Sequence, residues 1–169
     1  MPTLSVRRTR GVSLAIAGLA VLAAILTGCG ITIPSDPNGT LDGIRGGTLR
    51  AGVSLSEGLA RETSDGSLRG PLIELVESFA ADQDATVEWT VDSEETLVGM
   101  LESDDLDIAV GGMTDQTPWT DRVGVTRGYA GIEGAAGRSL VMLVPLGENR
   151  MLSTLEDFLD HELEHGSGS

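Results

Sequence analysis

One stretch of the sequence concentrates groups that bind small anions. Residues 111–122 read Gly-Gly-Met-Thr-Asp-Gln-Thr-Pro-Trp-Thr-Asp-Arg, which places three threonine hydroxyls, one tryptophan and one arginine beside a glycine pair. An arginine fork among hydroxyls and backbone N–H groups is the donor set that a carboxylate requires. Glycine pairs also occur in phosphate-binding loops, but no lysine or glycine-rich helix start follows this one, which favours a tight strand exit. The stretch therefore predicts a carboxylate-binding loop.

A second pattern, His161-Glu162-Leu163-Glu164-His165, formally matches the H-E-x-x-H motif of zinc proteases. Only Gly-Ser-Gly-Ser follows it, so the sequence supplies no downstream third ligand. These are the two histidines of the chain, which also leaves no Ser-His-Asp arrangement. We interpret the pattern as a solvated helix end and predict no metal site, no catalytic residue and no cofactor.

The elements that position the loop follow from hydrophobic periodicity. Apolar residues alternate over 49–53 and 87–91 and run together over 106–110, which predicts three strands. Helical stripes begin at Pro71 and after Asp92, which is spaced from Glu95 as in a capping box. Strand, helix, strand, helix, strand with short joints predicts a parallel sheet. Ligands bind outside the carboxyl ends of such strands, here residues 54–58 and 111–122.

The remainder of the chain completes one lobe. Leu140–Val144 is a continuous apolar run typical of a buried strand, and residues 151–159 predict a last helix capped at Asn149. The predicted fold is a single α/β lobe over residues 46–160, with a mostly parallel sheet of about four or five strands flanked by helices. A polar tail is expected over 161–169.

Three segments together resemble family 3 of the bacterial extracellular solute-binding proteins, which serve ABC importers of polar amino acids. They are Leu49-Arg-Ala-Gly-Val53, Gly70-Pro-Leu-Ile-Glu-Leu-Val-Glu-Ser-Phe-Ala80 and Leu101-Glu-Ser-Asp-Asp-Leu-Asp-Ile-Ala-Val-Gly-Gly-Met-Thr114. The resemblance implies a type II periplasmic-binding-protein-like lobe. It also implies a small polar solute, such as an amino acid, as ligand and an ABC permease as membrane partner.

The resemblance also carries ligand-binding roles onto this chain. In the family, the Gly-Met-Thr loop offers backbone and hydroxyl groups, and an arginine after a Thr-Pro pair grips the α-carboxylate. With Ser54 at the end of the first strand and Trp119 as a ligand platform, the expected site is Ser54, Gly112, Met113, Thr114, Thr117, Trp119, Arg122 and Tyr129.

Two of these roles have alternatives. Trp119 is equally compatible with a cover over the edge of the lobe. Arg122 follows the Thr-Pro pair by four residues where the family usually has two, and pairing with Asp115 or Asp121 is the alternative to ligand binding.

Residues 130–139 stand where family members insert a second lobe. Ten residues rich in Gly and Ala predict a turn, so a ligand would be half exposed, whereas pockets usually bury about 70–90% of a small molecule. The alternative function is therefore a single-lobe interaction module that contacts a membrane transporter or sensor. An enzyme such as the dehydratases or transglycosylases of this fold ranks third, because no acid–base pair stands out.

The N-terminus predicts an address at the membrane. A basic segment over 1–10 and an apolar run over Val12–Leu26 form a secretory signal, and Leu26-Thr27-Gly28-Cys29 resembles the bacterial lipobox. We expect residues 1–28 to be a signal peptide and Cys29, the single cysteine, to be lipidated at the extracytoplasmic face of the cell membrane. Residues 29–45 are then expected to be a flexible tether.

The mature part is strongly acidic. Three of the eleven basic residues precede Cys29, which leaves eight arginines against 26 Asp and Glu and a formal charge of −18. Such a surface repels phosphate backbones, so nucleic acid is not an expected partner.

Overall fold

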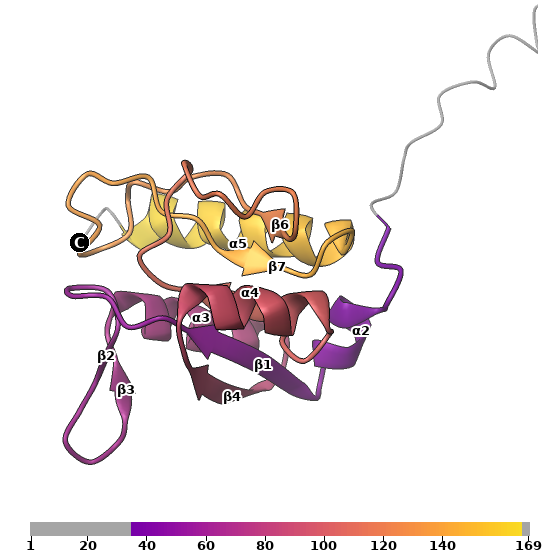
Figure 1. Cartoon of the computed structure of the whole chain (residues 1–169), viewed down its shortest axis with the longest axis horizontal. Coiled ribbons are helices and arrows are strands. Elements are labelled where there is room, and N and C mark those ends of the chain that lie inside the picture. The colour runs from indigo at the N-terminus through magenta and orange to yellow at the C-terminus, as the bar shows by residue number, and fades with distance from the viewer. Residues whose placement is uncertain (1–34, 167–169) are drawn as a thin grey trace, which may run out of the picture. The chain divides into compact units, whose positions relative to one another are not determined.

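The computed structural model describes residues 35–166 (Figure 1). The predicted signal peptide, Cys29 and the lipobox lie outside the described residues. The elements follow one another as α2 (Thr40–Ile44), β1 (Thr48–Val53), β2 (Arg61–Glu62), β3 (Leu68–Arg69), α3 (Pro71–Asp82), β4 (Thr86–Val91), α4 (Glu94–Glu102), β5 (Ile108–Val110), β6 (Gly124–Val125), β7 (Leu143–Val144) and α5 (Asn149–Gly166).

One five-stranded sheet, in the order β4-β1-β5-β7-β6, forms the centre of the lobe. β1 pairs in parallel with β4 along its whole length and with β5 at its end, whereas β7 and β6 are short and antiparallel. The predicted single α/β lobe with flanking helices is confirmed. The run Leu140–Val144 is buried throughout, but only Leu143 and Val144 form a strand.

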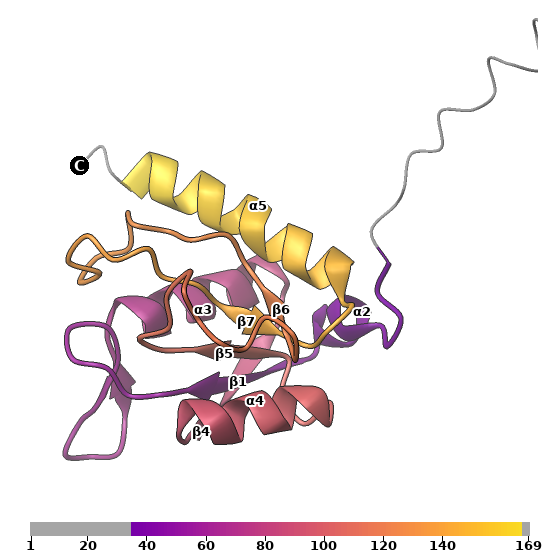
Figure 2. The same cartoon turned by 45° about the horizontal axis from the view of Figure 1, so that its top comes forward.

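Helices cover both faces of this sheet (Figure 2). Leu49, Ala51 and Val53 of β1 belong to a core that also takes the apolar sides of α3, α5 and α2. The opposite face packs against α4 and residues 113–123. The chain crosses from β1 to β4 on one side and then to β5 on the other, so crossovers of one hand place α3 and α4 on opposite faces.

Local sequence explains how the two crossover helices begin. α3 starts with Pro71 at its first position, where the missing N–H has no intrahelical partner to lose. Its buried Phe79 meets Phe158 of α5 edge to face, with ring centroids 5.5 Å apart. The predicted capping box at α4 is wrong by one residue. Ser93 is the N-cap and accepts from the Thr96 N–H at 3.3 Å. Asp92 accepts the Ser93 N–H at 2.7 Å.

The predicted tether is wrong for residues 35–45. Leu41 and Ile44 of α2 are completely buried in the core with α3 and α5, so this segment is part of the lobe. At the other end, Asn149 is the first residue of α5 and not its cap, and the helix runs beyond the expected tail boundary to Gly166.

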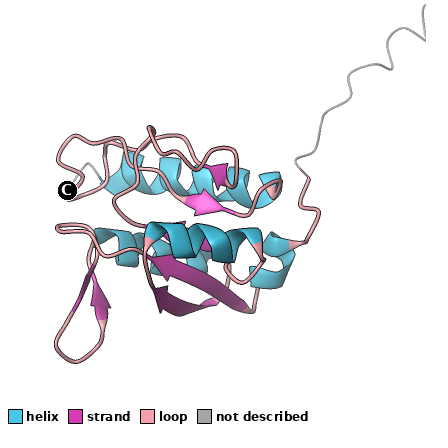
Figure 3. Ribbon diagram, viewed as in Figure 1, coloured by secondary structure: helices cyan, strands magenta, loops and turns pink. Residues whose placement is uncertain are grey.

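The sequence did not indicate the hairpin of β2 and β3, which stands out from the lobe (Figure 3). Within residues 35–166, no helix combines the length and the apolar character needed to cross a membrane.

Candidate functional site

The carboxyl ends of β1 and β5 meet at one point of the sheet edge. Ser54 donates its N–H to the Val110 carbonyl at 2.9 Å, and Gly111 follows β5 directly. A Cβ on Gly111 would lie 3.0 Å from the Ser54 carbonyl oxygen, so glycine lets these strand ends approach. The connections after β1 and after β5 leave toward opposite sides of the sheet, which makes this the switch point where ligands bind in such folds.

The loop after β5 carries unpaired backbone donors. None of the N–H groups of residues 111–114 donates a hydrogen bond within the described part of the chain. The carbonyls of Met113 and Thr114 do accept, from Val141 at 3.0 Å and from Thr117 at 2.9 Å. Successive unpaired N–H groups favour anions, because each needs an acceptor. The Met113 side chain is buried in the core between the sheet and α4, so Met113 can offer a ligand only its backbone.

Residues 130–139, the connector, fold back onto this edge. Tyr129 and Leu140 at its two ends exchange backbone hydrogen bonds of 2.7 and 3.1 Å, which close it into a loop. Gly134 has φ +78°, and a Cβ there would lie 2.1 Å from the carbonyl oxygen of Gly58. The connector therefore lies in backbone contact with the loop that follows β1.

This contact brings an arginine to the site. A Cβ on Gly112 would lie 2.9 Å from the Ser56 hydroxyl oxygen and 3.7 Å from Nη1 of Arg138, so both side chains flank the same glycine. The Arg138 Nε donates to the Ala135 carbonyl at 3.1 Å. In contrast to Arg122, Arg138 forms no ion pair with any carboxylate of the described residues.

Arg122 does not reach this edge. Its Nε donates to Glu102 Oε1 at 2.9 Å, and a second bond joins its Nη2 to Glu102 Oε2. Glu102 is the last residue of α4. A crossover helix runs antiparallel to the strands it connects, so Glu102 lies at the edge of the sheet where the parallel strands begin. The expected pairing with Asp115 or Asp121 is therefore corrected to Glu102, whose pKa the hydrogen bonds from Arg122 lower.

Trp119 lies with Arg122, whereas the Thr117 N–H donates to the Thr114 carbonyl. The Trp119 ring packs against the core between the sheet and α4 and carries the Arg122 guanidinium 5.3 Å from its centroid. Of the two interpretations of Trp119, this placement matches a cover over the lobe. The Thr117 hydroxyl is buried and, among the described residues, has no hydrogen-bond partner.

The Tyr129 side chain is committed to α5. Its hydroxyl accepts from Arg127 Nε at 2.9 Å and donates to the Glu156 carbonyl at 3.3 Å. Burial raises the pKa of Tyr129. Of the eight expected site residues, the structure thus brings together Ser54, Gly112, Met113 and Thr114, with Thr117 hydrogen-bonded to Thr114. It places Trp119, Arg122 and the side chain of Tyr129 elsewhere.

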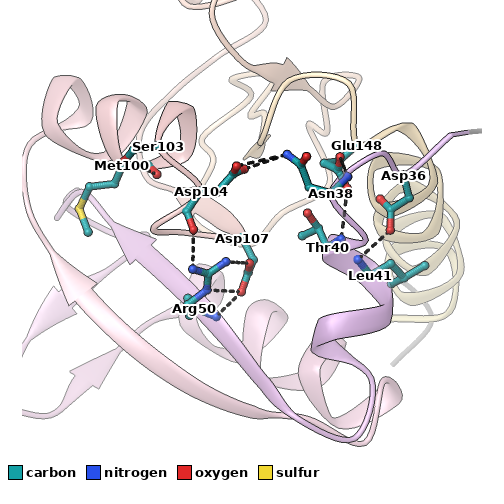
Figure 4. A network of polar contacts seen from close by, with 10 residues as sticks. All are labelled: Asp36, Asn38, Thr40, Leu41, Arg50, Met100, Ser103, Asp104, Asp107 and Glu148. Atoms are coloured by element: carbon teal, nitrogen blue, oxygen red, sulfur yellow. Dashed lines mark hydrogen bonds and ion pairs between the residues drawn. The ribbon is translucent and has the colours of Figure 1, made fainter.

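A second polar region occupies the opposite edge, where the parallel strands begin (Figure 4). It contains a hollow of about 500 Å³ lined by Asn38, Gly39, Thr40, Gly43, Thr48, Arg50, Asp104 and Asp107. Arg50 donates its N–H to Asp107 at 2.8 Å and its Nε to the same carboxylate at 3.2 Å. Because this cation is already neutralised, the hollow is a poorer carboxylate site than the edge at Gly112. No group of three or more potential metal ligands occurs among the described residues.

Two buried carboxyl groups fasten residues 35–45 near this hollow. Glu148, only 1% exposed, accepts the N–H groups of Asn38 at 2.9 Å and Thr40 at 3.2 Å (Figure 4). Burial raises the pKa of Asp36, and its hydrogen bond to Glu148 raises it further. Burial opposes ionisation of Glu148 too, but the hydrogen bonds from Asp36 and from the two N–H groups lower its pKa below the usual value. The two shifts are opposite, so Glu148 ionises more readily than Asp36.

Sequence reasoning missed Ser56 and Arg138 as individual site residues. Ser56 lies within the loop that the strand order assigns to the ligand edge. Arg138 stands in a Gly- and Ala-rich connector, and no local pattern indicates that this connector returns to the carboxyl ends of β1 and β5.

Comparison with solved structures places the fold. A variant of the arginine-bound form of domain 1 from TmArgBP superposes with a TM-score of 0.65 at 18% identity, over 73% of this chain and 98% of that domain. An ancestral arginine-binding protein bound to arginine gives 0.63 at 13% identity, over 73% and 95%. An ancestral cyclohexadienyl dehydratase gives 0.66 at 14% identity, over 80% and 94%.

At these identities the likeness defines the fold, which is that of one lobe of a periplasmic-binding-protein-like domain. No protein-family model matches the sequence, and no curated protein matches it significantly.

Proposed function

We propose that this chain is a solute-binding lobe of the family 3 type, which holds a small polar solute of the amino-acid class at the carboxyl edge of β1 and β5. The observation that carries the proposal is the superposition on 98% of a single domain that is itself arginine-bound. The unpaired N–H groups of residues 111–114 supply donors at the carboxyl edge of β1 and β5.

The superposed domain also bears on the missing second lobe. It is a single domain of this fold in an arginine-bound form, which supports solute binding by one lobe. With about half the usual contacts, we expect this chain to bind more weakly than a two-lobed receptor, with a Kd between micromolar and millimolar. A tenfold change in Kd corresponds to about 1.4 kcal/mol.

The same proposal places the protein at the outer face of the cytoplasmic membrane and links it to ABC transport. The sequence around Cys29 supports lipidation, since a small-residue tetrapeptide follows a charged and then an apolar segment. Two or more acyl chains hold a protein firmly at a membrane, whereas one binds only marginally. Metabolic labelling with a radioactive fatty acid tests this: the wild type should be labelled and Cys29→Ser should not.

We further propose that the lobe is not an enzyme, despite its likeness to an ancestral dehydratase. The side chains that flank Gly112 are the Ser56 hydroxyl and the Arg138 guanidinium. Carboxyl and imidazole side chains are not among Ser54, Ser56, residues 111–114 and Arg138, so those residues offer no acid–base pair.

Calorimetric titration tests the binding function. The full chain, solubilised in a mild detergent, is titrated with the twenty amino acids and with simple carboxylic acids. At ten times Kd, a bound ligand should raise the free energy of unfolding by about 1.4 kcal/mol. A chain that gives neither heat nor a thermal shift with any of them at tens of millimolar is not a solute receptor, and the interaction module then becomes the better account.

A further inference from the structure

The described arginines differ in what already binds them. Arg50, Arg122, Arg127 and Arg150 each form an ion pair with a carboxylate, and Arg45 donates to Gln83. Arg61 and Arg69 belong to the hairpin of β2 and β3. The guanidinium of Arg138 lies beside Gly112 and has only the Ala135 carbonyl as a partner among residues 35–166. It is therefore an unneutralised cation at the edge where the candidate site lies.

We infer that Arg138 is the residue that binds the carboxylate group of the solute, with the Ser56 hydroxyl as a second donor. The inference rests on the proposed function and names the ligand class: a small solute with a carboxylate group. Ser56 Oγ and Arg138 Nη1 both lie within 4 Å of one point above Gly112, so one planar carboxylate can contact both. The unpaired N–H groups of residues 111–114 begin at the same glycine pair.

The charge of the lobe favours a cation at the site. The chain after Cys29 carries a formal charge of −18, so an anionic group approaches against a repulsive field. A guanidinium offers a carboxylate two parallel N–H donors, which a lone hydroxyl cannot. Arg122, the arginine expected for this role, is held by Glu102 at the other edge of the sheet.

The position of Arg138 also explains how a chain without a facing lobe supplies a clamp. The connector that replaces the second lobe is held on the loop after β1 by the Gly134–Gly58 contact, and it ends at Arg138 and Ser139. The residue that completes the site thus comes from the connector itself.

The test varies residue 138 of the protein and the carboxylate group of the ligand together. Calorimetry on the full chain in detergent compares L-arginine and L-glutamine with their C-terminal amides, which lack the carboxylate, for the wild type, Arg138→Gln and Arg138→Lys. The wild type should bind each acid about 10- to 100-fold more tightly than its amide, the scale of a charge-assisted hydrogen bond. Arg138→Gln should lose this preference while its affinity for the amides stays within about twofold. Arg138→Lys should keep part of the preference, because it keeps the charge and loses the fork.

Arg45→Gln is the matched control, since it removes the same charge at the opposite edge and should leave the preference unchanged. An equal preference for acid and amide in the wild type, or a full preference in Arg138→Gln, overturns this inference and leaves the solute-binding function standing. Tighter binding of inorganic phosphate than of any carboxylic acid also overturns it. A wild type that binds none of these ligands overturns the proposed function and this inference together.

Discussion

Removal of the Glu148 carboxylate should loosen the N-terminal segment of the lobe. Glu148 is 1% exposed and accepts the N–H groups of Asn38 and Thr40, which lie 110 and 108 residues earlier in the chain. No other contact of the described residues satisfies these two N–H groups. The carboxylate thus joins residues 35–45 to the start of α5.

The magnitude follows from those two bonds. A hydrogen bond to a charged group contributes about 1.5–3 kcal/mol when its loss leaves the partner unpaired. Both bonds are only partly buried, so water replaces some of each. Removing the acid also ends both its hydrogen bond and its charge repulsion with Asp36, and these two losses oppose each other. We expect Glu148→Ala to lower the free energy of unfolding by about 2–4 kcal/mol, or Tm by roughly 5–15 °C for a chain of this size. Glu148→Gln keeps one acceptor oxygen and should lose less than half as much.

Circular dichroism melting of the full chain in detergent at pH 7 gives the Tm values. Trypsin adds a local readout, because Arg45 closes the segment and its cleavage should accelerate in Glu148→Ala. Cleavage after Arg61, in the hairpin of β2 and β3, should keep its wild-type rate. A Tm within 1 °C of wild type for Glu148→Ala, or equal damage from Glu148→Gln and Glu148→Ala, would refute this account of the segment.

Three further changes test other parts of the lobe. Burial and the hydrogen bond to Glu148 raise the folded pKa of Asp36, so the stability this group contributes is complete at low pH and is lost as pH rises through that pKa. Between pH 4 and 8, Tm should therefore fall less for Asp36→Asn than for the wild type. Parallel curves of Tm against pH would contradict this prediction. Gly134→Ala places a Cβ 2.1 Å from a backbone oxygen at a positive φ, and it should lower the free energy of unfolding by about 1–3 kcal/mol in chemical denaturation. Gly131→Ala has open space around its Cβ and should be neutral. Equal effects of the two variants would contradict the Gly134–Gly58 backbone contact. Ser93→Ala removes the N-cap of α4 and should lower the free energy of unfolding by about 1 kcal/mol in the same assay, whereas Ser93→Asp should stay close to the wild type. Equal stability of the two variants would contradict the role of Ser93 as the N-cap.

Periodicity predicted the long central elements because each is built from contiguous residues that face one core. β1 alternates through Leu49, Ala51 and Val53, and α3 buries Leu72, Val76 and Phe79 at helical spacing. The short strands β6 and β7 have two residues each, too few for any period to appear. α2 has only five residues, and its burial depends on helices far along the chain.

The candidate site was predictable only as far as the topology alone determines it. Ser54 and Gly112 follow parallel strands that neighbour each other, so their proximity follows from the strand order. The destination of Arg122 depends on where α4 ends, and that of Arg138 on the path of a connector with no regular structure. Both are tertiary outcomes of which the local sequence carries no sign.

The most direct test of the central claim is calorimetric titration of the wild-type chain with L-arginine and the other amino acids. The account predicts saturable binding of at least one of them, with one site per chain and a Kd between micromolar and millimolar. Absence of heat with all twenty at tens of millimolar, together with an unchanged Tm, would contradict it.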